Sequence, residues 1–390
     1  MTGALTDLAV AARLAGKALV RRLRSDIEPP PNLDDFTRGM QQLLDTVSPG
    51  IIRDSAWLSM PASQPPWVGS GLHLEPGDEI SYFIAGRAYA NKALDIYVSP
   101  QLQVWCKIGT EGTIFRGTRS THSFRAQTGG ELCFGNYFPN DWADSTGTRK
   151  QDDAVYSEVS GELKILAIRW AAGAQEGLAA LAGTGDHEGL LTSELQRLQH
   201  PPTAPSGWTY LWHLGPAEIF REQPGEDGQP CIHCRTHADV GILQRPVDLP
   251  LAEDSEISWR WCVDKLPIDL REDSVPSHDY LSIAVEFDNG RDITYYWSSQ
   301  LPEGTGYDCP LPNWRGKEYH VVIRSGTRGL GEWLTERRNL MEDYRHYMGE
   351  PPERITRVWF IANSIFQRGT GECTYADIVL QSGGKKIQVL

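Results

Sequence analysis

The sequence lacks the features that mark membrane-spanning and nucleic-acid-binding proteins. None of its apolar runs is long enough for a helix that crosses a bilayer. Positive charge is in deficit, with 37 Lys and Arg against 51 Asp and Glu and a net charge of −14. Such a charge repels phosphate backbones and anionic lipid surfaces. We therefore expect no transmembrane segment and no nucleic-acid partner.

Cysteine is scarce. The 390 residues contain seven cysteines, an odd number without the spacing of a small secreted disulfide framework. The N-terminus carries its basic residues after its apolar stretch, which is the reverse of the order in a signal peptide. These features predict a reducing, cytoplasmic location.

Motifs of several common enzyme classes are missing. The sequence has no G-x-S-x-G elbow, no P-loop, no H-E-x-x-H, and no G-x-G-x-x-G between a strand and a helix. Their absence disfavours hydride transfer and phosphoryl transfer. We expect no nucleotide cofactor.

Short segments in which apolar and polar residues alternate dominate two parts of the chain. Examples are EISYFIAG and LQVWCKIG in residues 51–170, and ISWRWCVD and DITYYWSS in residues 208–390. Clusters of Gly, Pro, Asn and Asp separate them, as in all-β proteins. The pattern predicts a mostly β protein with two β-sandwich domains of jelly-roll or galactose-binding type. Residues 1–50 are predicted to form a helical extension and residues 171–207 a helical connector and linker. A further helix is predicted within GEWLTERRNLMEDYRHYMG.

The N-terminal extension has apolar residues at helical spacing from Leu5 to Leu23. A second short helix is predicted from Asp34 to about Val47. The first helix either packs on its own domain or docks on a membrane surface or a partner. A role in assembly stays open, and a homo-oligomer is one expected partner state.

The stretch CIHCRTH, residues 231–237, has C-x-x-C spacing followed by a histidine. If residues 231–243 form one strand, alternation places Cys231 and Cys234 on opposite faces. Zinc needs converging ligands, so a zinc site here is disfavoured. The face that carries His233, Arg235 and His237 is either solvent-exposed surface or the floor of a binding site.

Neighbouring strands offer polar residues opposite their apolar faces. On the alternation pattern, Trp259, Trp261 and Trp297 belong to the core, whereas Arg260 and Tyr296 are candidates for ligand binding. Candidates for acid/base chemistry are Glu286, His237 and Asp279. Ordinary surface ion pairs are the alternative explanation for such charges.

Residues 67–170 carry the landmarks PGDEISYFIAGRAYA, LQVWCKIGTEGTI, GELCFGNYFP and VSGELKILAI in that order. This segment resembles the PA-I-type galactose-binding, calcium-dependent bacterial lectins. The resemblance implies a β-sandwich and calcium as a cofactor, which the sugar hydroxyls help to coordinate. Tyr89 matches the family's tyrosine, and Asn136 stands near its aspartate position. Glu158 stands where the family has an asparagine, and Asp141 lies in a longer intervening loop and is a further candidate calcium ligand.

The second half carries SWRWCVDKLP, ITYYWSS and TYADIVL. From about Asp239 to Leu380 it resembles a bacterial domain family of unknown function. That resemblance implies a jelly-roll-like sandwich and supplies no chemistry.

Two functions remain open. The first is binding of a small carbohydrate-like or polyhydroxylated ligand, because exposed Trp and Tyr rings can cover the apolar faces of sugars. Trp142 in PNDWADS and Trp314 in CPLPNWRG lie in loop-like sequence and are the aromatic candidates. The alternative is a cofactor-independent cyclase, isomerase or lyase that acts on a metabolite in a cleft between the sandwiches.

Overall fold

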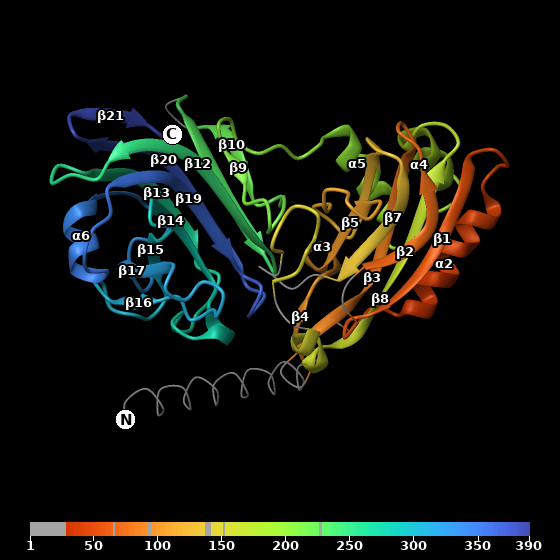
Figure 1. The fold of residues 1–390 in the computed structure, drawn as a ribbon, viewed down its shortest axis with the longest axis horizontal. Coiled ribbons are helices and arrows are strands. Elements are labelled where there is room, and N and C mark those ends of the chain that lie inside the picture. Colours follow the sequence, from red (N-terminus) through yellow and green to blue (C-terminus); the bar gives the residue numbers. More distant parts are fainter. Residues whose placement is uncertain (1–28, 65–66, 93–94, 137–141, 151–152, 226–227) are drawn as a thin grey trace. The chain divides into compact units, whose positions relative to one another are not determined.

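A computed structural model describes residues 29–64, 67–92, 95–136, 142–150, 153–225 and 228–390 (Figure 1). The predicted helix at residues 5–23 lies outside the described residues. The chain divides into two compact units, Met1–Pro202 (unit 1) and Thr203–Leu390 (unit 2). Both are mostly β, as predicted, and both have a sandwich-like arrangement of sheets. In the described part of the chain, no helix is both long and apolar enough to cross a membrane.

Unit 1 contains a larger sheet with the order β1-β8-β3-β4, to which β6 adds by pairing with β3, and a smaller sheet with the order β2-β7-β5. The strands are β1 (Ile52–Pro61), β2 (Trp67–Leu74), β3 (Glu79–Asn91), β4 (Ile96–Val98), β5 (Val104–Ile108), β6 (Thr121–Arg125), β7 (Gly130–Asn136) and β8 (Ser160–Trp170). The helices are α2 (Leu33–Thr46), α3 (Pro100–Gln103), α4 (Ala174–Ala182) and α5 (Leu190–Gln199), with a 3-10 turn, η1 (Asp153–Glu158).

The larger sheet of unit 1 is buried on both faces. Along β8, Ile165 belongs to the core between the sheets, whereas the next residue, Leu166, belongs to a second core with α2, α4 and α5. This double burial explains why the centre of β8, ILAI, is continuously apolar. The predicted helix near 34–47 is confirmed as α2, whose first turn is capped by Asn32. Helices α4 and α5 pack on the sheet and so belong to the fold of unit 1.

His122, on β6, is a half-buried histidine with a buried ring nitrogen, and it makes unit 1 sensitive to acid. Burial, followed by the nearby charge of Arg197, lowers the pKa of His122 to about 4, and its Nδ1 has no hydrogen-bond partner. Because the folded-state pKa lies below the unfolded value of 6.5, the stabilisation is present above pH 6.5 and is lost as the pH falls toward 4.

We expect His122→Phe to reduce this acid sensitivity by about 2–3 kcal/mol between pH 6.5 and 4, since the substitution removes the titrating ring and keeps an aromatic beside Phe124. Urea unfolding at pH 7.5 and pH 4.5 measures the effect. Equal losses of stability in the wild type and the variant would contradict it.

Unit 2 contains one sheet with the order β10-β11-β20-β13-β18, extended by β21 on β20, and a second sheet with the order β16-β17-β15-β14-β19-β12-β9. The strands are β9 (Thr209–Tyr210), β10 (Phe220–Pro224), β11 (Pro230–His237), β12 (Val240–Pro250), β13 (Glu256–Lys265), β14 (Tyr280–Phe287), β15 (Asp292–Ser298), β16 (Gly306–Asp308), β17 (Glu318–Ser325), β18 (Trp333–Asn339), β19 (Arg354–Asn363), β20 (Thr370–Ser382) and β21 (Lys385–Gln388). They are accompanied by a 3-10 turn, η2 (Val275–Ser277), and by α6 (Leu340–Tyr347).

The core of unit 2 lies between these two sheets and is rich in aromatic residues. Trp259, Trp261 and Trp297 are at most 1% exposed, which confirms their predicted packing role. Trp259 stacks on Tyr295 across the sandwich, with ring centroids 5.7 Å apart. Such aromatic pairs add to the free energy gained by burial alone.

Two predicted elements of unit 2 are wrong in part. The long helix predicted within GEWLTERRNLMEDYRHYMG begins only at Leu340, because Trp333–Asn339 pairs with β13 as strand β18. Asn339 caps the helix by accepting a hydrogen bond from the Glu342 backbone N–H. The second error is the single strand predicted over 231–243, which is in fact two strands, β11 and β12, in different sheets. They meet at a turn where Ala238 has φ of 51°.

Candidate functional site

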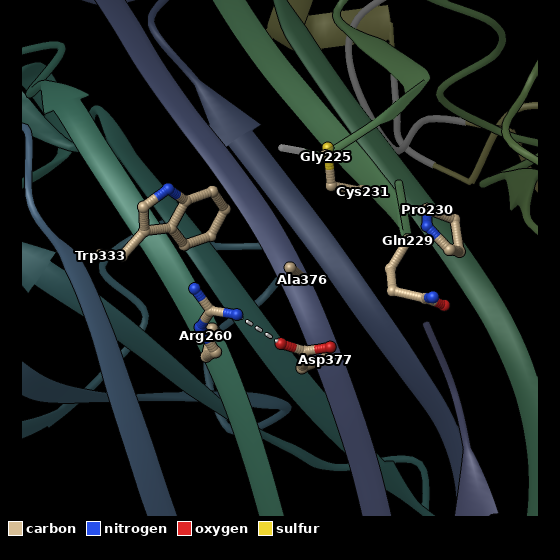
Figure 2. A pocket seen from close by; sticks show the side chains of 8 residues that line it. All are labelled: Gly225, Gln229, Pro230, Cys231, Arg260, Trp333, Ala376 and Asp377. Atoms are coloured by element: carbon tan, nitrogen blue, oxygen red, sulfur yellow. Dashed lines mark hydrogen bonds and ion pairs between the residues drawn. The ribbon is translucent and has the colours of Figure 1, made fainter. Parts of the chain in front are cut away.

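A pocket lies on the outer face of the sheet that contains β11, β20, β13 and β18, opposite the core (Figure 2). We call it the outer-face pocket. Its volume is about 140 Å³, which is far below the 300–1,000 Å³ of a typical small-molecule or cofactor site. The lining residues are Gly225, Gln229, Pro230, Cys231, Arg260, Trp333, Ala376 and Asp377.

Trp333 forms the wall on β18. The Trp333 side chain points away from the core. The next residue, Leu334, packs against the core, as strand alternation requires. The ring is 39% exposed, which is unusual among the tryptophans of this chain. The guanidinium carbon of Arg260, on the neighbouring strand β13, lies 5.0 Å from the ring centroid and holds the indole by a cation–π contact.

A β-bulge shapes the floor of the pocket. Arg260 pairs with Ala376 and Ser258 pairs with Val379, so β20 has one more residue than β13 between these pairs. The extra residue lets Ala376 and Asp377 both avoid the core, although they are adjacent in sequence; Tyr375 and Ile378 on either side are fully buried. Asp377 has φ of 51°, a left-handed conformation that costs free energy for a residue other than glycine.

Arg260 and Asp377 form an ion pair across the floor, with Nη1 2.8 Å from Oδ2 (Figure 2). Their side chains are 38% and 45% exposed, so the pair contributes at most about 1 kcal/mol to stability. Its importance is chemical. The two charges cancel, yet the guanidinium and the carboxylate still offer hydrogen-bond donors and acceptors to a ligand.

The hairpin between β10 and β11 forms the opposite wall. Gly225 and Gln229 close it through a backbone hydrogen bond of 2.7 Å. Cys231 lies at its base and donates its thiol hydrogen to the carbonyl of Gln223 at 3.3 Å. Cys234 lies on the other face of β11, in the core. The two thiols therefore do not converge, and β11 offers no C-x-x-C zinc site.

The residues predicted for ligand binding are dispersed. Arg260 lies in the outer-face pocket. Trp142 is 1% exposed and stacks on Trp67, so it is a packing residue despite its loop-like sequence. Tyr296 is fully buried and accepts a hydrogen bond from the Tyr307 hydroxyl. Trp314 is half-buried, with its ring against Trp359.

The three acid/base candidates do not form one site. Asp279 directly precedes β14 and Glu286 lies near its other end, about 23 Å away along the strand. Glu286 is held by Arg357 at 2.8 Å, and His237 lies on the other sheet beside Thr370. Burial raises the pKa of Asp279 to about 7, yet its oxygens accept backbone hydrogen bonds from residues 366 and 367, which is a loop-capping role.

Asn136, one of the expected calcium ligands of unit 1, does not fit a calcium shell. Asn136 is fully buried; its side-chain oxygen accepts from the Gln103 amide, and its nitrogen donates to the carbonyl of Ala62. Calcium needs several oxygen ligands that are free to converge. The Tyr89 ring packs on Tyr97. Asp141 and the Glu158 side chain lie outside the described residues.

Sequence reasoning missed two features. Trp333 and Asp377 were not candidates, because Trp333 was assigned to a helix and a β-bulge has no simple sequence signal. The second missed feature is a buried cluster of His278, Cys309, Glu318 and His320, on or beside strands of the other sheet of unit 2. The E-x-H spacing of EYHVVI, two potential ligands on one face of a strand, is the signal that points to it.

Comparison with known proteins adds little about chemistry. A family model described as "Protein of unknown function (DUF3047)" matches residues 221–379. No curated protein matches the chain.

Three solved structures illustrate the structural likenesses. The N-terminal domain of EclA, a PllA-like lectin, is 14% identical, with 31% of this chain and 99% of that chain covered and a TM-score of 0.23. The xyloglucanase domain of NopAA from Sinorhizobium fredii is 8% identical (46% and 94% covered, TM-score 0.28). A family 30 carbohydrate-binding module from Clostridium thermocellum is 10% identical (47% and 95% covered, TM-score 0.27). Likenesses this slight transfer no function to this chain.

Proposed function

We propose that unit 2 binds a neutral, polyhydroxylated ligand, one ring of a carbohydrate, in the outer-face pocket. The observation that carries the proposal is the exposed indole of Trp333 beside the Arg260–Asp377 pair. A sugar ring has an apolar face and a rim of hydroxyls. The indole matches the face, and the ion pair matches the rim, since hydroxyls both donate and accept hydrogen bonds.

The size and charge of the pocket narrow the ligand class. A volume of about 140 Å³ suits one sugar ring and excludes a dinucleotide. Because Arg260 is already neutralised by Asp377, an anionic ligand gains little net attraction there. The acid/base candidates Glu286, His237 and Asp279 are not among the lining residues, so the geometry favours binding over catalysis.

The test is a fluorescence titration of the full chain with neutral oligosaccharides of different sugars and linkages, compared with a charged uronic-acid oligomer. We expect saturable quenching or a spectral shift with at least one neutral oligosaccharide, and weaker binding of the charged one. Tight binding of the uronic acid alone would contradict the proposal, and so would no response to any sugar.

The strained backbone at Asp377 gives a second prediction. Glycine adopts positive φ without a steric penalty, so Asp377→Gly relieves strain while it breaks a surface ion pair. We expect the free energy of unfolding to change by less than about 1 kcal/mol and sugar affinity to fall about tenfold. Urea denaturation and calorimetric titration measure the two quantities. A large loss of stability with unchanged affinity would show that the bulge serves folding alone.

A further inference from the structure

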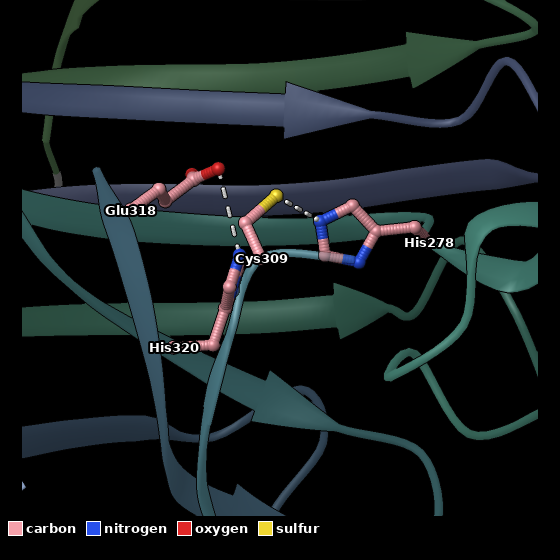
Figure 3. Close-up of side chains that lie close together, drawn as sticks. All are labelled: His278, Cys309, Glu318 and His320. Carbon is pink, nitrogen blue, oxygen red and sulfur yellow. Dashed lines mark hydrogen bonds and ion pairs between the residues drawn. The ribbon is translucent and has the colours of Figure 1, made fainter. Parts of the chain in front are cut away.

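Four side chains with metal-binding atoms meet inside unit 2, on the face of the β14–β15–β17 region opposite the core (Figure 3). His278 precedes β14, Cys309 follows β16, and Glu318 and His320 lie two residues apart on β17. All four are at most 3% exposed, and one ligand atom of each lies within 4.8 Å of the others. The cluster is distinct from the outer-face pocket, which lies on the other sheet.

His320 is the residue of this cluster that most favours a metal site. It is fully buried, and neither ring nitrogen has a hydrogen-bond partner. Nε2 lies 3.5 Å from Glu318 Oε2, at the limit of a hydrogen bond. The ring is instead held by aromatic contacts, stacking on Tyr307 with centroids 5.1 Å apart. Nδ1 has no partner, and Nε2 has only the long contact with Glu318. Buried nitrogens without a hydrogen bond are costly for a folded protein, and a bound metal would satisfy one of them.

The outer contacts of the cluster orient its ligands as in metal sites. His278 Nδ1 lies 2.6 Å from the backbone carbonyl of Glu272. A carbonyl only accepts, so Nδ1 carries the hydrogen, and the lone pair of Nε2 faces Cys309, whose Sγ lies 3.4 Å away. The Tyr280 hydroxyl donates to Glu318 Oε1 at 2.8 Å, which leaves Oε2 for the cluster. Such second-sphere bonds to histidine and carboxylate ligands are typical of metal centres.

We propose that His278, Cys309, Glu318 and His320 bind one zinc ion. Ligands at 2.0–2.3 Å in a tetrahedron lie about 3.3–3.8 Å from one another, and the Cys309–His278 and Glu318–His320 separations of 3.4 and 3.5 Å are in that range. Two imidazoles, a thiolate and a carboxylate form a donor set that suits zinc. The thiolate and the carboxylate also neutralise its 2+ charge, so the buried site carries no net charge.

The site is structural. Four protein ligands fill a tetrahedral shell, and their burial leaves no position open to water or substrate. Zinc would join the segment before β14, the segment after β16 and strand β17, which lie up to 42 residues apart in the chain (278 to 320). Because coordination by Cys309 requires the thiolate, zinc binding releases a proton and weakens as the pH falls.

The experiment measures metal content and the cobalt spectrum of the full chain. We expect one zinc per chain in protein purified without chelator. Replacement by Co²⁺ should give the intense visible bands of a tetrahedral site and a thiolate-to-cobalt charge-transfer band. Cys309→Ser should lose that charge-transfer band and at least tenfold in zinc affinity.

Cys231→Ser is the matched control, because Cys231 is also a buried cysteine of unit 2 and belongs to the C-x-x-C stretch. It should keep the zinc and the full cobalt spectrum. If Cys309→Ser does not fold, the charge-transfer band in Cys231→Ser decides. The proposal is overturned if wild-type protein neither holds nor takes up zinc or cobalt, if the cobalt spectrum lacks the thiolate band, or if Cys231→Ser alone loses the metal.

Discussion

Trp333→Ala should lower the affinity of the protein for its sugar ligand by about ten- to thirtyfold, or about 1.4–2 kcal/mol. The substitution removes the aromatic wall of the outer-face pocket and leaves Arg260 without its cation–π partner. The cost to stability should be small, because the ring is already 39% exposed and lies outside the core.

Trp212→Ala is the matched control for this prediction. Trp212 is 46% exposed, belongs to the same unit, and does not line the pocket. Calorimetric titration with the best oligosaccharide should give wild-type affinity for this variant. If both variants lost affinity equally, exposed tryptophan in general would be responsible, and the outer-face pocket would not be the binding site.

His320→Phe should change the stability of unit 2 with a sign that depends on zinc. With zinc a thousandfold above its dissociation constant, the variant loses the linkage term of about 4 kcal/mol. In chelator, the same substitution should be neutral or stabilising. It removes two buried nitrogens that lack a hydrogen bond, at the cost of one long contact with Glu318, and keeps a ring stacked on Tyr307.

Thermal unfolding with zinc and with EDTA measures both signs. His346→Phe, at an exposed histidine on α6, should show no zinc-dependent difference from wild type. Destabilisation of His320→Phe by the same amount in zinc and in EDTA would mean that the ring serves packing alone.

The sequence correctly predicted which face of a strand a side chain occupies, because apolar and polar residues alternate along a strand. ISWRWCVD places Trp259 and Trp261 inward and Arg260 outward, and the structure has them so. The same rule put Cys231 and Cys234 on opposite faces of β11 and so argued against zinc at that motif. These predictions depend only on the period of a strand and not on which strands are neighbours.

The sequence did not predict features that depend on contacts between segments distant in the chain. WLTERRN has the Glu and Arg content of a helix, but pairing with β13 makes it a strand and exposes Trp333. The bulge that turns Asp377 outward exists only in register with β13. Glu318 and His320 show a ligand spacing in sequence, whereas the approach of His278 and Cys309 depends on how β14, β16 and β17 assemble.

The most direct test of the proposed function is ¹⁹F NMR of protein labelled with 5-fluorotryptophan, titrated with a neutral oligosaccharide. Trp333→Phe assigns the resonance of Trp333, and Trp212→Phe and Trp314→Phe assign two control resonances. The account predicts that the Trp333 signal shifts in a saturable way, while the signals of Trp212 and Trp314 stay in place. A saturable shift of Trp314 or Trp212 with no change at Trp333 would contradict it.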